Sequence, residues 1–230
     1  MATQFKPTVY VVDDDAGIRR FIQVACAAPA REVKCFPSAE GFLRAYDDSG
    51  DHPRCLILDV RLPGMSGPEL HQRLLESGAL IPVIMQTGLG DVPTAVESLK
   101  NGAVDFLEKP VTRTALLETV NRGLMLDGER RIARKQRSNF QGKLTSLSRR
   151  EREVFQLLSD CKTNKQIAAM MRIGFQTAAK HRANVFKKLD VGNEFEFMQL
   201  VDHAGQLVAV EDPAHGGGEF NAGERLAEQR

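Results

Sequence analysis

The first half of the chain alternates short apolar runs with segments of helical periodicity. The apolar runs, which we predict to be strands, cover residues 8–12, 33–36, 55–58, 82–86 and 104–107. Continuous runs such as Cys55-Leu56-Ile57-Leu58 are typical of strands buried on both faces, and strands that alternate with helices form parallel sheets. We therefore predict an α/β domain with a five-stranded parallel sheet covered by helices. For this sheet we assume the flavodoxin-like strand order 2-1-3-4-5.

The second half has a helical pattern throughout. Capping-box spacings that start at Ser148, Thr163 and Asn193 predict short helices, and the segment at about 163–189 has helix-turn-helix spacing. The stretch before them is rich in Arg, Lys and Gln, which predicts a solvated helical linker. The Gly- and Pro-containing end of the chain lacks a buriable stripe, which predicts disorder. The expected units are an α/β domain over 1–126, a helical linker over 127–143, an all-α helix-turn-helix domain over 144–206 and a tail over 207–230.

Charge separates the two halves more sharply than the net charge of +1 indicates. Residues 1–126 carry a net charge of −3, residues 127–210 carry +7, and residues 211–230 carry −3. A basic half that follows an acidic half predicts different partners for the two, and nucleic acid suits the basic one.

Length and composition predict a soluble two-domain protein. A chain of 230 residues with 42% hydrophobic residues is sufficient for two packed cores. The longest stretch without a charged residue, 77–90, is shorter than a membrane span, and no signal-type apolar region follows Met1. We expect a cytoplasmic protein without membrane contact, and the four scattered cysteines predict neither a disulfide nor a zinc site.

Polar side chains follow four of the five predicted strands. Each one alone is compatible with a solvated turn or a cap, but carboxyl ends of parallel strands meet at one edge of a sheet, where ligands bind. Three converging carboxylates suit Mg²⁺. A metal-bound carboxylate can attack phosphorus, and a lysine can neutralise a phosphoryl oxygen, which are the roles we predict for Asp59 and Lys109. The residues at these strand ends are Asp13, Asp14 and Asp15, then Asp59, then Thr87, and finally Lys109.

These residues lie within motifs that resemble the receiver domain of bacterial two-component response regulators, over about residues 6–126. The resemblance implies that a sensor histidine kinase transfers a phosphoryl group to Asp59. It implies Mg²⁺ held by Asp14, Asp59 and the backbone carbonyl of Arg61, with Asp13 acting through water. The motifs that carry the resemblance are Val-Val-Asp13-Asp14-Asp15, Leu-Asp59-Val-Arg-Leu-Pro-Gly-Met-Ser-Gly, Thr87-Gly88 and Phe106-Leu-Glu-Lys109-Pro110.

The same resemblance implies a switch. Thr87 and Phe106 would be its two moving side chains, and the Lys109–Pro110 peptide would be cis. Phosphorylation is expected to draw the Thr87 hydroxyl inward, to turn the Phe106 ring and to alter the surface over 92–101 and 104–108. We expect that surface to form a homodimer.

The basic half resembles a LuxR/FixJ-type DNA-binding domain over about residues 144–206. Seven Lys and Arg residues and no acidic residue lie between Asp160 and Asp190, as expected of a duplex-binding surface. Three departures from the family pattern occur: Arg172 replaces the turn glycine, Gly174 replaces a Ser or Thr cap, and Ala178-Ala179 replace Val-Lys. The segments that carry this resemblance are Leu147-Ser-Arg-Arg-Glu151-Arg-Glu-Val, Asn164-Lys165-Gln-Ile167-Ala168 and Thr177-Ala-Ala-Lys180-His181-Arg-Ala-Asn184.

The predicted recognition helix covers residues 175–189. Its N-terminal part is expected in the major groove, with Gln176 and Lys180 near base edges. The remaining predicted contacts are Lys165, Lys187 and Lys188 on phosphates, with Thr177 and Asn184 in the same interface.

The sequence therefore predicts a DNA-binding response regulator of a two-component phosphorelay. Phosphorylation of Asp59 would control dimerisation and transcription, with a histidine kinase, duplex DNA and RNA polymerase as partners. We expect no enzyme activity beyond its own phosphorylation and dephosphorylation. An aspartyl-nucleophile phosphatase is disfavoured because Asp59-Val-Arg-Leu lacks the second carboxylate of the DxDx[TV] pattern. The altered recognition helix leaves a second alternative, a phosphorylated protein-interaction module that does not bind DNA.

Overall fold

The computed structural model describes residues 6–88 and 97–209, with side chains up to residue 202. The chain divides into two compact units between Ile132 and Ala133. None of the helices in the described ranges is long and apolar enough to cross a membrane.

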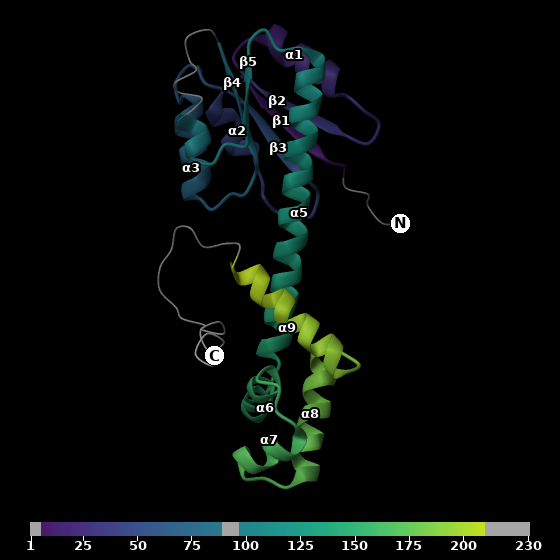
Figure 1. Ribbon diagram of the computed structural model, residues 1–230. Coiled ribbons are helices and arrows are strands. Elements are labelled where there is room, and N and C mark those ends of the chain that lie inside the picture. The colour runs from purple at the N-terminus through teal and green to yellow at the C-terminus, as the bar shows by residue number, and fades with distance from the viewer. Residues whose placement is uncertain (1–5, 89–96, 210–230) are drawn as a thin grey trace, which may run out of the picture. The chain divides into compact units, whose positions relative to one another are not determined.

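The first unit is built on a five-stranded parallel sheet in the order β2-β1-β3-β4-β5 (Figure 1). This order confirms the predicted fold class, and each strand lies within one residue of its predicted bounds at either end. Strands β1 and β3 are buried along their whole length, which explains their unbroken apolar runs. The strands are β1 Thr8–Val12, β2 Glu32–Phe36, β3 Arg54–Asp59, β4 Val83–Thr87 and β5 Asp105–Glu108.

Helices cover both faces of this sheet. Figure 1 shows α1 and α5 on one face and α2 and α3 on the other. Ile22 of α1 and Leu116 of α5 pack with Ile84, whereas Phe42 of α2 and Leu70 of α3 pack with Met85 and other side chains of the opposite face. The helices are α1 Ala16–Cys26, α2 Ala39–Ala45, α3 Gly67–Glu76 and α5 Arg113–Thr145.

Helix α5 does not end where the α/β domain was predicted to end. It continues without a break from Arg113 to Thr145, so the predicted linker is its second half. Asp127, the first predicted linker residue, is buried: its Oδ2 accepts from the backbone N–H of Arg54 at 2.7 Å and from Nε of Arg131 at 2.6 Å. Arg131 also donates to Asp48 at 2.8 Å. These bonds attach the helix to the first unit as far as Arg131.

The second unit consists of helices around one small core. Capping boxes at Ser148 and Thr163 begin two of the helices, as their spacing predicted. The last helix extends to Ala209, three residues beyond the predicted boundary, and the predicted disorder of residues 210–230 concerns residues outside the described ranges. The helices are α6 Arg149–Ser159, α7 Asn164–Met171, α8 Phe175–Leu189 and α9 Glu194–Ala209. The core contains Leu147, Val154, Ile167, Ala178, Val185 and Phe197.

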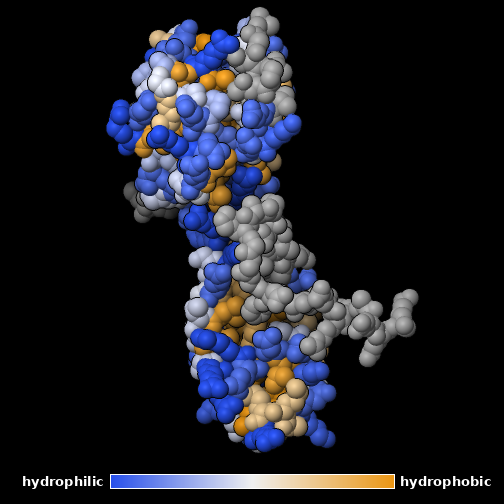
Figure 2. All heavy atoms as spheres, turned by 90° about the vertical axis from the view of Figure 1, so that its left-hand side faces the viewer, coloured by the Kyte–Doolittle hydropathy of each residue, from blue (hydrophilic) through white to orange (hydrophobic). Residues whose placement is uncertain are grey.

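The face of the molecule drawn in Figure 2 is mostly hydrophilic. On the face drawn in Figure 2, apolar residues gather in separate patches between charged and polar ones.

Removal of the Asp127 carboxylate should destabilise the first unit. In Asp127→Ala, the Arg54 N–H loses its acceptor and Arg131 loses one of its two carboxylates, so the free energy of unfolding should fall by about 3 kcal/mol. Tyrosine fluorescence during urea unfolding of the full chain measures this unit alone, because both tyrosines lie in it and the chain has no tryptophan.

The matched control is Glu129→Ala, two residues along the same helix, where the side chain is exposed. It should change the free energy of unfolding by less than about 0.5 kcal/mol. Equal stability of the Asp127→Ala and wild-type chains would show that this end of the helix is not anchored in the first unit.

Candidate functional site

Three carboxylates meet at the carboxyl end of the sheet. Carboxylate oxygens of Asp13, Asp14 and Asp59 lie within 4.8 Å of one another. The parallel pairing of β1 with β3 explains this, because Val12 pairs with Leu58 and the next residue of each chain segment is an aspartate. The third residue of the acidic run has another role: Asp15 caps α1 by accepting from the backbone N–H groups of Gly17 and Ile18.

Lys109 is the cation of this cluster. Its Nζ lies 2.9 Å from Asp13 Oδ2 and 2.7 Å from Asp59 Oδ2. Burial opposes the charged ammonium, but the hydrogen bonds that Lys109 donates to Asp59 and Asp13 outweigh this effect and raise the pKa of Lys109. Burial raises the pKa of Asp59, and repulsion from Asp13 adds to the shift while Lys109 opposes it. Three carboxylates against one ammonium leave an excess of negative charge that suits a divalent, oxygen-loving cation such as Mg²⁺.

The other predicted receiver residues lie around this cluster. Thr87 ends the neighbouring strand β4, is buried, and donates from Oγ1 to the carbonyl of Gly88 at 3.1 Å. Its own carbonyl accepts from the Lys109 N–H at 2.8 Å, and the Lys109–Pro110 peptide is cis, as the resemblance implied. Arg61 lies two residues after Asp59, and its N–H donates to Asp59 Oδ1 at 3.3 Å.

Phe106 is half-buried in β5 opposite Met85 and packs against the core on the α2 and α3 face. The predicted dimer surface includes residues 92–96, which lie outside the described ranges. The roles of Phe106 and of this surface therefore stay predictions.

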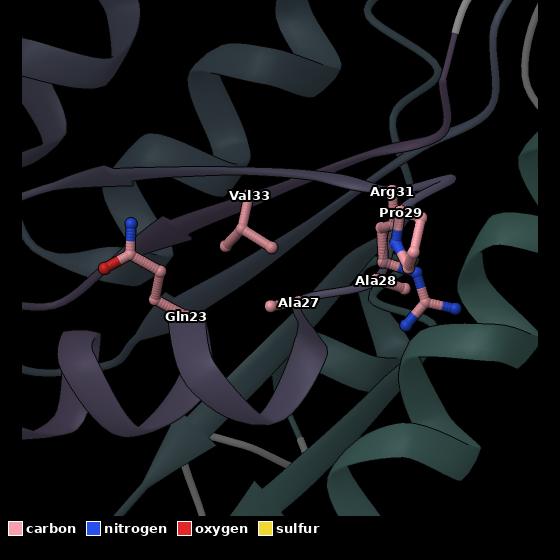
Figure 3. A pocket seen from close by; sticks show the side chains of 6 residues that line it. All are labelled: Gln23, Ala27, Ala28, Pro29, Arg31 and Val33. Carbon is pink, nitrogen blue, oxygen red and sulfur yellow. The ribbon is translucent and has the colours of Figure 1, made fainter.

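Two hollows flank helix α1. One, of about 470 Å³, lies between α1 and the segment after β5, and it adjoins the acidic cluster because Lys109 lines it. The other, of about 430 Å³, lies at the opposite end of α1, where Figure 3 shows the Gln23 amide on one side and the Arg31 guanidinium on the other. Arg31 donates to Asn121 at 2.6 Å. The first hollow is lined by Gly17, Ile18, Phe21, Gln86, Lys109 and Pro110, among others.

The helix-turn-helix of the second unit contains α7 and α8. Arg172 ends α7 with φ +52° and ψ +47°, the left-handed conformation in which the family's glycine would be unstrained. Gly174 begins α8 without a side-chain cap. Two of the three departures noted in the sequence thus lie in the turn, and their structural cost is local because the core residues on both helices are in place.

Most of the predicted DNA-contact residues are accessible. Ala178, Val185 and Leu189 form the buried face of α8, which leaves the other faces of the helix free. Asn184 is half-buried. The exposed predicted contacts are Lys165 on α7 and Gln176, Thr177, Lys180, Lys187 and Lys188 on α8.

Lys188 differs from the others because it is bonded within its own unit. Its Nζ donates to Glu151 Oε2 at 2.7 Å and to the carbonyl of Ser146 at 2.9 Å. For Lys188 to contact a phosphate, as predicted, it must give up these two bonds. Lys165 and Lys187 are exposed and have no such intramolecular bond in the described structure. A sequence gives no signal for such a pairing, since 37 residues separate Lys188 from Glu151.

Comparison with known proteins defines the class. The chain matches the response regulator receiver domain over residues 9–121 and the luxR family of bacterial regulatory proteins over residues 145–201. It belongs to the response regulators that join a receiver domain to a LuxR-type DNA-binding domain, and it is a DNA-binding two-component response regulator.

Particular relatives support this assignment over most of the chain. Transcriptional regulatory protein FixJ of Azorhizobium caulinodans is 38% identical over 208 residues, which cover 90% of this chain and 96% of FixJ. Response regulator protein TmoT of Ectopseudomonas mendocina is 35% identical over 195 residues, which cover 84% of this chain and 87% of TmoT. Among solved structures, the response regulator StyR has a TM-score of 0.79 at 39% identity and covers 86% of this chain and 99% of its own.

The Glu151–Lys188 pair should make the second unit sensitive to acid. The hydrogen bond from Lys188, with that from the Ser148 N–H, lowers the pKa of Glu151 from 4.5 to about 2. Because the pKa is lower in the folded state, the pair stabilises the unit above about pH 4.5 and loses this contribution as the pH falls towards 2. Protection factors of α6 and α8 amides against hydrogen exchange should therefore fall over that window.

Glu151→Gln keeps an acceptor for the cap but removes the charge, so it should lower protection near neutral pH and flatten the pH dependence. Glu153→Gln is the control, because Glu153 is on the same helix and pairs with the exposed Arg149 and Arg150. An unchanged pH profile in Glu151→Gln would mean that another group controls acid sensitivity.

Proposed function

We propose that this response regulator accepts a phosphoryl group on Asp59 from a sensor histidine kinase. The observation that carries the proposal is the position of the Asp59 carboxylate, 2.7 Å from the Lys109 ammonium and beside Asp13 and Asp14. A carboxylate oxygen of Asp59 attacks phosphorus, the bond from phosphorus to the donor nitrogen breaks, and an aspartyl phosphate forms. Lys109 then exchanges a carboxylate partner for a phosphoryl oxygen.

The acidic cluster fits Mg²⁺ as the cofactor of this step. We assign Asp14, Asp59 and the backbone carbonyl of Arg61 as ligands, with Asp13 acting through water. Bound Mg²⁺ would supply positive charge to the phosphoryl oxygens. Aspartyl-nucleophile phosphatases carry a general acid two residues after the nucleophile, and Arg61 occupies that position here. We therefore propose that the chain catalyses only its own phosphorylation and dephosphorylation and is not a phosphatase for other substrates.

The phosphorylated state is proposed to favour a homodimer. The new phosphoryl group draws the Thr87 hydroxyl from its bond with the Gly88 carbonyl, and the Phe106 ring turns towards the space that Thr87 leaves. A change from 1:99 to 99:1 in the active population requires about 5.5 kcal/mol of differential stabilisation. Charge-assisted bonds from Lys109 and Mg²⁺ to the phosphoryl oxygens are strong enough to contribute much of this.

Phosphorylation in vitro should identify Asp59. With acetyl phosphate and Mg²⁺, the wild-type chain should gain one phosphoryl group by intact mass, and Asp59→Asn should gain none. Asp14→Asn should be labelled more slowly because one metal ligand is lost. The measurement is the time course of the added mass.

Asp15→Asn is the matched control. Asp15 adjoins the cluster but caps α1, and asparagine caps helices equally well, so its labelling should match that of the wild type. Labelling of Asp59→Asn at the wild-type level would contradict the assignment of Asp59 as the phosphoacceptor.

The DNA-binding function is proposed to use helix α8 in the major groove. Gln176 and Lys180 lie near base edges, with Thr177 and Asn184 beside them, and Lys165 and Lys187 contact phosphates. Lys188 is assigned mainly to its bond with Glu151. RNA polymerase is the proposed downstream partner. The luxR-family match over 145–201 favours this function over a protein-interaction module that does not bind DNA.

Two lysines of α8 should behave differently on DNA. Lys180→Ala should lower affinity for a selected duplex by about 1–3 kcal/mol and relax the preference at one base pair. Lys187→Ala should lower the affinity for selected and random duplexes equally. It should also reduce the slope of log affinity against log salt concentration by about one. Fluorescence anisotropy titrations at several salt concentrations measure both effects.

Lys188→Ala is the internal comparison, because the bonds of Lys188 lie within the second unit. This variant should lower the stability of the second unit, and its effect on the salt slope should be small. If Lys180→Ala lost the same affinity for the selected and the random duplex, Lys180 would be a phosphate contact, and Gln176 would be the residue that contacts a base.

A further inference from the structure

The loop between β3 and α3 carries one of the proposed metal ligands. It covers residues 60–66, begins directly after Asp59, and contains Arg61, whose backbone carbonyl is assigned to the cation. Mg²⁺ demands near-octahedral geometry, so a carbonyl on a loop is a good ligand only when its peptide plane is held in one orientation. The contacts that fix the backbone of this loop therefore bear on the affinity of the site for metal.

The two ends of the loop are fixed by bonds of its own backbone. The N–H of Gly67 donates to the carbonyl of Val60 at 3.1 Å, and the N–H of Arg61 donates to Asp59 Oδ1 at 3.3 Å. A Cβ at Gly67 would lie 2.1 Å from the carbonyl oxygen of Asp59, so a side chain there would push the end of the loop away from β3. These contacts close the loop at its base and leave its middle to be held from elsewhere.

A carboxylate from another element holds the middle of the loop. Glu40 lies in the first turn of α2, and its Oε1 accepts a hydrogen bond from the backbone N–H of Met65 at 3.1 Å. The preceding residue, Gly64, has φ +80°, and a Cβ there would lie 3.0 Å from the same Oε1. The backbone of the loop therefore lies directly against this carboxylate, although 25 residues separate Glu40 from Met65.

The bond from Met65 to Glu40 gives the loop an orientation that apolar packing does not. Hydrogen bonds from the backbone N–H groups of Glu40 itself and of Met65 lower the pKa of Glu40, so its carboxyl group is charged at neutral pH. A bond to a charged acceptor is stronger than one to a neutral acceptor, and it is directional. The Met65 side chain packs against the core on the α2 and α3 face, but apolar contact has no preferred direction.

We propose that Glu40 is a positioning residue for the metal ion of the phosphoacceptor site. By accepting from the Met65 N–H, it holds the loop so that the Arg61 carbonyl points to the cation beside Asp59. Glu40 acts through the loop and is not itself assigned as a metal ligand, which is the relation that outer partners of metal ligands have in other proteins. This inference rests on the proposed metal site and adds a residue from α2 to it.

Two conservative variants separate the hydrogen bond from the charge. Glu40→Asp keeps the charge, but its carboxylate is one methylene shorter and does not reach the Met65 N–H. Its Kd for Mg²⁺, measured by titration calorimetry on the full chain, should rise about tenfold. Glu40→Gln loses the charge but keeps an acceptor oxygen at the same reach, so its Kd should stay within about threefold of the wild type.

The labelling rate provides a second readout. With acetyl phosphate, Glu40→Asp should need about tenfold more Mg²⁺ for half-maximal labelling and should come within about twofold of the wild-type rate when Mg²⁺ saturates. A general loss of stability would instead lower the rate at every Mg²⁺ concentration. Both variants should remain folded in urea titrations followed by tyrosine fluorescence, because Glu40 is half-buried and Ser38 still caps α2.

Glu32→Ala is the matched control for the loss of a carboxylate. Glu32 is exposed at the amino end of β2, and its ion pair with Lys34 at 3.4 Å is also exposed, so this variant should bind Mg²⁺ as the wild type does. An unchanged Kd in Glu40→Asp would overturn the proposal. A rise in Glu40→Gln as large as that in Glu40→Asp would also overturn it, because the retained acceptor would then not be what holds the loop. Failure of the wild type to bind Mg²⁺ or to be labelled at Asp59 would instead contradict the proposed function.

Discussion

The repulsion among the carboxylates of Asp13, Asp14 and Asp59 is the constraint on which the receiver unit depends. Parallel pairing of β1 and β3 brings these groups within 4.8 Å of one another, and Lys109 neutralises only part of their charge. An excess of negative charge at a cluster of carboxylate oxygens is the arrangement that suits a divalent cation such as Mg²⁺. The same lysine contacts Asp59 and lines the hollow beside α1.

Polar side-chain bonds hold helix α5 in each of the two units. In the first unit, Asp127 and Arg131 are joined to β3 and to the loop before it, and β3 itself ends at Asp59. In the second unit, Lys143 donates to the carbonyl of Leu189 at 2.8 Å, at the end of the recognition helix. Each unit therefore holds its part of the helix through specific polar bonds, which are sensitive to geometry in a way that apolar packing is not.

The strength of the sequence evidence differed between the two units for a physical reason. In the receiver unit, one register of parallel strands places Asp59, Thr87 and Lys109 at adjacent strand ends, so strand boundaries were enough to predict the site. In the helical unit, the capping boxes predicted the helix starts, but a surface lysine has many available partners. Lys188 was predicted as a DNA contact, and only its distance of 2.7 Å from Glu151 showed the competing bond.

The sequence by itself determined the α/β and all-α halves and the polar residues that follow the strands. These depend on periodicity of apolar residues and on positions at strand ends, which are local properties of the chain. Only the tertiary structure decided where α5 is held, because the bond between Arg54 and Asp127 joins residues 73 positions apart. It alone also showed that Gln86, one residue from Thr87 and indistinguishable in sequence from a satisfied polar residue, has an unpaired oxygen. Whether a buried polar atom finds a partner depends on the packing of four elements at once, which a linear pattern does not record.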